Sequence, residues 1–187
     1  MTSPQAESLP QRKGRAFHAL MEAWALLETD AALSPEQILQ QPVWARLLAA
    51  FSLSRPHLLE VVEAAQRLLG HSQIRDWIGL APPQSLPAPQ RWSEREWLTP
   101  DGRRLRPDCV LAWPAPQARV RIIDWKWAVL QSERSDYAQQ LADYQALMAH
   151  HLPGQVIEAS VVTAKGEIWH LSDQGLVHWM PAGRPAL

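Results

Sequence analysis

Apolar residues recur at helical spacing through the first half of the chain. The segment GRAFHALMEAWALLE has an apolar residue at every third or fourth position, which predicts an amphipathic helix. This stripe consists of Phe17, Leu20, Met21, Trp24 and Leu27. Helical patterns continue in PEQILQQ, VWARLLAAF and PHLLEVVEAAQRLLG, where Ser34 with Pro35 is a favourable helix start and Gly70 a stop. We therefore expect the first half to be mostly helical.

Strand patterns begin after the proline-rich loop APPQSLPAPQ. The segments REWL, RLRPDCVLAW and RVRIIDWKWAV predict three consecutive strands, separated by the turn Pro100-Asp101-Gly102 and the loop PAPQA. A helix should follow, with Tyr137, Leu141, Tyr144 and Met148 on one face. The apolar segments QVIEASVVT and EIWHL then predict two closing strands.

This order of elements predicts an α+β fold with αβα-like layers. We expect a central mixed sheet of about five strands that contains an antiparallel hairpin and is flanked by helices. The 187 residues suit one domain with a substantial core. We expect a flexible lead-in over residues 1–12, a single domain over 13–180 with a helical insertion at 30–80, and a flexible tail over 181–187.

Composition narrows the class of protein. The chain is 47% hydrophobic and 20% charged, as in globular proteins, and no apolar run approaches the roughly 20 residues that span a bilayer. The N-terminal sequence lacks the apolar segment of a secretory signal, and Cys109 is the single cysteine. We therefore expect a cytoplasmic protein without a membrane partner or a disulfide framework. The net charge of −1 means that DNA binding would need a local basic patch.

The stretch RIIDWKWAV places Asp124 and Lys126 two residues apart in an otherwise apolar strand. Alternation puts these two side chains on one face of the strand, with Ile123 and Trp125 on the other. A hairpin around PAPQA also places Asp108 opposite Asp124. Like charges so placed are destabilising, and a divalent cation held between the carboxylates would compensate. The alternative is a local ion pair between Asp124 and Lys126, with Asp108 in a turn.

Four segments, in order along the chain, resemble the PD-(D/E)xK nucleases. The resemblance is to the nuclease domain at the C-terminus of helicase-nucleases of the exonuclease V beta-subunit type. GRAFH resembles a glycine-containing helix with a metal-ligand histidine, RPDCV the first metal aspartate, IIDWKW the Asp-x-Lys strand and YAQQLADY the next helix. The resemblance extends from about Gly14 to Leu171 and implies a restriction-endonuclease-like fold. Pro107 and Trp127 depart from the family pattern, which has glycine and a small polar residue there.

The resemblance implies a metal site that takes Mg²⁺ or Mn²⁺. In this sequence the implied ligands are His18, Asp108 and Asp124, together with the backbone carbonyl of Trp125. Lys126 is implied to be the catalytic lysine. For His18, the alternative is a histidine at the rim of a helix with no ligand role.

The helix after the strands carries two further implied site residues. Gln140 and Tyr144 match the Gln-x-x-x-Tyr pattern of the family, and at four residues apart they share a helix face, where they would position Lys126 or the DNA backbone. The alternative is packing for the tyrosine and a surface position for the amide. Glu94 and Glu96 precede RLRPDCV, and one of them resembles a family glutamate. A solvated edge strand explains the pair equally well, so neither is assigned to the site.

The implied activity is metal-dependent hydrolysis of DNA phosphodiester bonds, in DNA repair or recombination. Arg103, Arg104 and Arg106 would contact phosphates, or would form the solvated face of a hairpin. The sequence contains no Walker motif, so unwinding would come from a separate helicase or repair complex. The alternatives are a catalytically inactive nuclease fold that binds DNA or docks a protein, and a nuclease that processes RNA.

Overall fold

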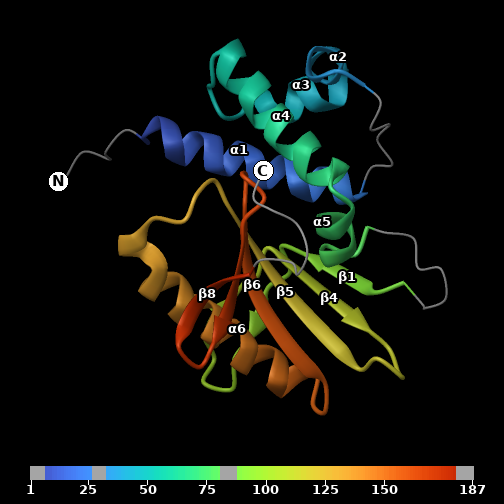
Figure 1. The fold of residues 1–187 in the computed structure, drawn as a ribbon, viewed down its shortest axis with the longest axis vertical. Helices are drawn as coiled ribbons and strands as arrows, with labels where there is room; N and C mark the ends of the chain where they lie inside the picture. The colour runs from blue at the N-terminus through green and yellow to red at the C-terminus, as the bar shows by residue number, and fades with distance from the viewer. Residues whose placement is uncertain (1–6, 27–32, 81–87, 180–187) are drawn as a thin grey trace.

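The structure is a computed structural model that describes residues 7–26, 33–80 and 88–179 (Figure 1). The expected tail, Leu27, half of the expected lead-in and most of the proline-rich loop lie outside these residues. The first half is helical, as predicted, with helices α1 (Leu9–Leu26), α2 (Pro35–Gln40), α3 (Pro42–Ala49), α4 (Arg55–Gly70) and α5 (Ser72–Trp77). Helix α1 begins at Leu9, inside the segment that we expected to be a flexible lead-in.

Local sequence explains where these helices begin. At the start of α2, the Ser34 side chain accepts a hydrogen bond from the backbone N–H of Gln37, whose side chain accepts one from the N–H of Ser34. This reciprocal pair satisfies two N–H groups that have no partner within the helix. Pro35 occupies the first turn, where its missing N–H costs nothing.

The second half forms a mixed sheet of six strands, in the order β1-β4-β5-β6-β7-β8, among the described residues. Its strands are β1 (Gln90–Ser93), β4 (Cys109–Trp113), β5 (Arg119–Lys126), β6 (Val156–Thr163), β7 (Ile168–Ser172) and β8 (Gly175–Trp179). Strands β5 and β6 are parallel and the other neighbours are antiparallel. The parallel pair is joined by the short 3₁₀ helix η1 (Gln131–Glu133) and helix α6 (Arg134–His151).

Two parts of the strand prediction were wrong. The segment RLRPDCVLAW is not one strand, because β3 (Arg104–Leu105) ends before Pro107 and β4 begins after it. Proline lacks the N–H that a continuous ladder needs, and β3 instead pairs with β2 (Trp97–Leu98) in a separate two-stranded sheet. The sequence pattern also missed β1 and β8, at the two edges of the large sheet.

The sheet separates two apolar layers (Figure 1). Leu111, Ile123 and Trp125 pack with helices α1 to α5 on one face, whereas Val110 and Ile122 pack with α6 on the other. This is the predicted alternation along β4 and β5. No helix in the described ranges is both long enough and apolar enough to cross a membrane.

The β4–β5 hairpin has the predicted register. Cys109 lies opposite Ile123, and the pairs continue to Trp113 opposite Arg119, around the loop PAPQA. One more step of this register beyond the start of β4 sets Asp108 opposite Asp124. This register brings Asp108 close to Asp124 near the C-terminal end of β5.

Candidate active site

Asp124 and Lys126 form an ion pair at the end of β5, on the face that packs against α6. The Nζ atom of Lys126 lies 2.6 Å from Oδ2 of Asp124. The Asp124 side chain is only 1% exposed, while that of Lys126 is 24% exposed. A buried carboxylate is thus held by an ammonium group that still reaches solvent.

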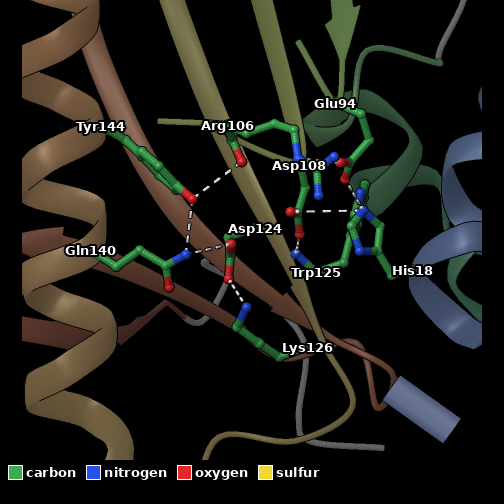
Figure 2. A network of polar contacts seen from close by, with 9 residues as sticks. All are labelled: His18, Glu94, Arg106, Asp108, Asp124, Trp125, Lys126, Gln140 and Tyr144. Atoms are coloured by element: carbon green, nitrogen blue, oxygen red, sulfur yellow. Dashed lines mark hydrogen bonds and ion pairs between the residues drawn. The ribbon is translucent and has the colours of Figure 1, made fainter. Parts of the chain in front are cut away.

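Asp108 lies between this ion pair and helix α1 (Figure 2). Its Oδ2 accepts a hydrogen bond of 2.7 Å from the backbone N–H of Trp125, and its Oδ1 lies 3.7 Å from Nε2 of His18. The N–H and carbonyl of one strand residue point to the same side of the strand. The carbonyl of Trp125 therefore points toward Asp108, whereas its side chain is buried in the core.

His18, Glu94 and Asp108 gather their side chains at one point. Each offers a ligand atom, and these atoms all lie within 4.8 Å of one another. The Oε1 atom of Glu94 is 2.6 Å from Nε2 of His18 (Figure 2). Asp124 is not part of this group, so the three side chains proposed as ligands are only partly brought together. Asp124 lies on the other side of Asp108 from His18, and its carboxylate contacts Lys126 (Figure 2).

Glu94 is the site residue that sequence reasoning left unassigned. Strand β1 pairs with β4 so that Ser93 lies opposite Cys109, and Glu94 is therefore carried next to Asp108. The Glu94 backbone has a φ of 51°, and its N–H donates to the carbonyl of Asp108 at 3.1 Å. A left-handed conformation is unusual for a glutamate and is often found at functional sites. Glu96, by contrast, is 59% exposed and pairs with Arg104.

Gln140 and Tyr144 of α6 approach the site from the other face of the sheet. The amide of Gln140 donates to Oδ1 of Asp124 at 3.4 Å and to the Tyr144 hydroxyl at 2.9 Å. The Tyr144 hydroxyl in turn donates to the carbonyl of Arg106 at 3.3 Å. This chain of contacts connects α6 to Asp124 and to the backbone just before Asp108 (Figure 2).

A family model for the PD-(D/E)XK nuclease superfamily matches residues 2–183 of the chain. The chain belongs to this superfamily. A search of the curated proteins found no match. The mixed sheet with its antiparallel hairpin and flanking helices fits the restriction-endonuclease-like fold of these nucleases. Nucleases of this superfamily generally use divalent metals.

Asp108 and Asp124 suit such a metal, because burial makes their ionised forms unfavourable when no cation is bound. The pKa of Asp108 is raised to about 8, first by burial and then by the nearby charge of Asp124, against the opposing effect of the Trp125 N–H. Burial also raises the pKa of Asp124, although the charge of Lys126 opposes this shift. A cation would stabilise both carboxylates in their ionised form.

Three buried atoms at the site also lack hydrogen bonds of normal geometry within the described residues. They are Nε2 of His18, Oε1 of Glu94 and Oδ2 of Asp124. They contact charged groups instead: Nε2 of His18 lies 2.6 Å from Oε1 of Glu94, and Oδ2 of Asp124 lies 2.6 Å from Nζ of Lys126. One imidazole nitrogen with carboxylate oxygens is a donor set that Mg²⁺ or Mn²⁺ can use. The residues present therefore fit a divalent cation.

The charge state of Lys126 follows from its neighbours. Burial alone would lower its pKa, but the charges of Asp124 and Asp108 outweigh burial, and the pKa is raised. Lys126 is therefore an ammonium group at neutral pH and cannot accept a proton. Its role at such a site is electrostatic: it can orient a water molecule or stabilise negative charge.

The arginines near the predicted hairpin fall into two groups. Arg106 lies at the site, where its Nε is 2.9 Å from Oε2 of Glu94 and its side chain is 60% exposed. Arg103 instead pairs with Asp101 and Asp143, and Arg104 pairs with Glu96. Of these three, Arg106 is the one placed to meet a phosphate at the candidate metal site.

Proposed function

We propose that this protein is a metal-dependent deoxyribonuclease that hydrolyses phosphodiester bonds, with Mg²⁺ or Mn²⁺ as its cofactor. One observation carries the proposal. His18, Glu94 and Asp108 bring their ligand atoms within 4.8 Å of one another, next to a buried Asp–x–Lys ion pair, in a chain that belongs to a nuclease superfamily. A structural role alone would not concentrate so many buried carboxylates at one strand end.

His18, Asp108, Asp124 and the carbonyl of Trp125 would hold the cation, and Glu94 would join them. Asp108 is central to this set because it lies within reach of both His18 and the Asp124 side of the site. A bound divalent cation would polarise the scissile phosphate and lower the pKa of a water molecule. Glu94 is placed to contribute by its 2.6 Å contact with His18.

Lys126 would orient the attacking water and stabilise the charge that develops on the phosphate. Asp124 holds the Lys126 ammonium group at 2.6 Å, and the Gln140 amide donates a hydrogen bond to the other carboxylate oxygen of Asp124. Tyr144 would hold the Gln140 amide in place through its 2.9 Å contact. In this proposal, Gln140 and Tyr144 act on the reaction by positioning, not by contact with DNA.

The proposal includes DNA as the substrate and a role in DNA repair or recombination, with unwinding supplied by a separate helicase. The exposed guanidinium of Arg106 supports a phosphate-bearing substrate. The rival is an inactive nuclease fold that binds DNA or docks a protein. The site retains each charged residue that the chemistry needs, which favours the active enzyme.

A cleavage assay tests the proposal. Purified protein is incubated with linear duplex DNA, single-stranded DNA and RNA. Each substrate is tested with Mg²⁺, with Mn²⁺ and, as a metal-free control, with a chelator. We expect metal-dependent DNA cleavage that falls at least about 100-fold in Asp124→Ala and in Lys126→Gln. Lys126→Gln keeps a hydrogen-bond donor for Asp124 but removes the charge, and circular dichroism checks that each variant folds.

Two outcomes would contradict this proposal. If wild type and variants bind DNA equally and none releases fragments, the protein is a binding or docking module. If RNA is cleaved and DNA is not, the proposal that DNA is the substrate is wrong. Glu96→Gln serves as the matched control, because Glu96 is an exposed carboxylate outside the site and its loss should leave cleavage unchanged.

A further inference from the structure

A cleft of about 520 Å³ opens beside the candidate metal site. His18 and Lys126 line it, so it is continuous with the groups proposed to act on the phosphate. The rest of its wall comes from the first turns of α1 and from the chain that connects β5 to α6. Its volume lies within the roughly 300–1,000 Å³ range of pockets that enclose a small molecule.

The wall of this cleft offers apolar and aromatic surface. Trp127, Leu130 and Tyr137 line it, and the Leu130 side chain is exposed to 57%. The indole of Trp127 meets the ring of Phe17 edge-on, with ring centroids 6.0 Å apart. Lys13 lies over the same indole at 5.6 Å, and Lys126 lies over the Tyr137 ring at 5.2 Å. Two aromatic rings are therefore fixed beside positive charges at the entrance to the site.

We propose that this cleft is a stacking subsite for one unpaired base of the DNA strand whose phosphate lies at the metal site. The inference rests on the proposed function and specifies its substrate: a single-stranded segment or end. A base stacks on an aromatic ring by its face, while Lys126 in the cleft wall attracts an adjoining phosphate. In a duplex the base faces are covered by their neighbours and only the edges are accessible in the grooves.

The acidic residues of the cleft do not oppose a DNA strand strongly. Glu7 is paired with Arg15 at 3.0 Å, which leaves Glu133 as the acidic residue of the cleft lining without a cationic partner among the described residues. Gly14 faces Trp127 across the cleft wall, where a larger residue would fill space.

Single-stranded oligonucleotides with one abasic nucleotide, moved stepwise along the strand, test the subsite. We expect cleavage by wild type to fall about 10-fold when the missing base adjoins the cleaved phosphate, because stacking on an aromatic ring is lost. In Trp127→Leu, which keeps apolar packing against Phe17, cleavage of the intact strand should fall similarly and the position of the missing base should not matter. Trp127→Phe keeps an aromatic ring, so the dependence of cleavage on the position of the missing base should return.

Controls separate this inference from the proposed function. A blunt duplex of the same sequence should be cleaved more slowly than the single strand, and Trp97→Ala, a tryptophan of the two-stranded sheet, should behave as wild type. If wild type cleaves every oligonucleotide equally, or Trp127→Leu keeps the dependence on base position, the subsite is refuted while the nuclease stands. If wild type cleaves no DNA, both are refuted.

Discussion

Asp108 connects the two halves of the site. Its Oδ2 is fixed by the Trp125 N–H and its Oδ1 faces His18, so the orientation of the carboxylate is set before any ligand arrives. The same position has a cost for stability. A carboxyl group with a pKa of about 8 in the folded protein and near 4 in the unfolded chain favours unfolding as pH rises between these values. Here the fold keeps acids that destabilise it without metal.

Asp108→Asn should therefore stabilise the metal-free protein. The amide stays neutral, so its advantage should be small near pH 4, grow as pH rises through the range in which the unfolded carboxyl ionises, and exceed about 1 kcal/mol at pH 8. Mg²⁺ should raise the melting temperature of wild type but not of the variant. Thermal unfolding at pH 4, 6 and 8, with and without Mg²⁺, measures both effects. A variant that is less stable than wild type at pH 8 would contradict the burial argument.

Glu94 and Glu96 form a matched pair for testing the metal site. Glu94→Gln removes a charge from the group around His18 and should weaken Mg²⁺ binding by about 10- to 100-fold. Glu96→Gln changes an exposed residue paired with Arg104 and should leave binding unchanged. Titration calorimetry with Mg²⁺ or Mn²⁺ distinguishes them. Equal affinities in the two variants would remove Glu94 from the proposed ligand set.

Helix α1 brings His18 to the sheet, and Gly14 lies where this helix packs against Trp127. A Cβ atom at Gly14 would lie 3.6 Å from Cβ of Trp127, which is an ordinary contact distance. Glycine inside a helix costs roughly 0.5–1 kcal/mol relative to alanine. Gly14→Ala should thus raise the free energy of unfolding by about that amount, measured by urea denaturation. A loss of stability would mean that the helix cannot accept even a methyl group against β5.

The helices and the central hairpin could be predicted because their signals are local. Apolar residues at helical spacing gave α1 and α4, and alternation in β5 together with the short loop gave the pairing of Cys109 with Ile123. From that register followed the approach of Asp108 to Asp124. The pairing of Asp124 with Lys126 needed only the two-residue period of a strand.

What could not be predicted depends on pairing between distant segments. Strand β1 has only four residues with no clear alternation, and it forms because β4 offers it an edge. Glu94 owes its place beside Asp108 to that pairing, so no local signal distinguished it from Glu96. Likewise, Pro107 divides the expected strand, which a reading of the apolar pattern alone overlooked.

The charges of the protein as a whole are close to balance, so the proposed contact with DNA has to be local. The net charge is −1, and Arg103 and Arg104 are engaged with acids away from the metal site. Lys126 and Arg106 lie at the site, and Arg15 lines its cleft. Two or three phosphate contacts would follow, compared with the six to ten or so of a strongly basic DNA-binding protein.

The salt dependence of binding reports this number directly. For single strands, the logarithm of the binding constant should fall with the logarithm of salt concentration with a slope of about −1.5 to −2, or −0.7 per phosphate contact. We expect Arg106→Ala to flatten the slope by about 0.7 and Arg104→Ala to leave it unchanged. Fluorescence anisotropy with Asp124→Asn and Mg²⁺ measures binding without cleavage. A slope near −5, or equal effects of the two arginines, would show that DNA follows a broader basic surface than the one around Arg106.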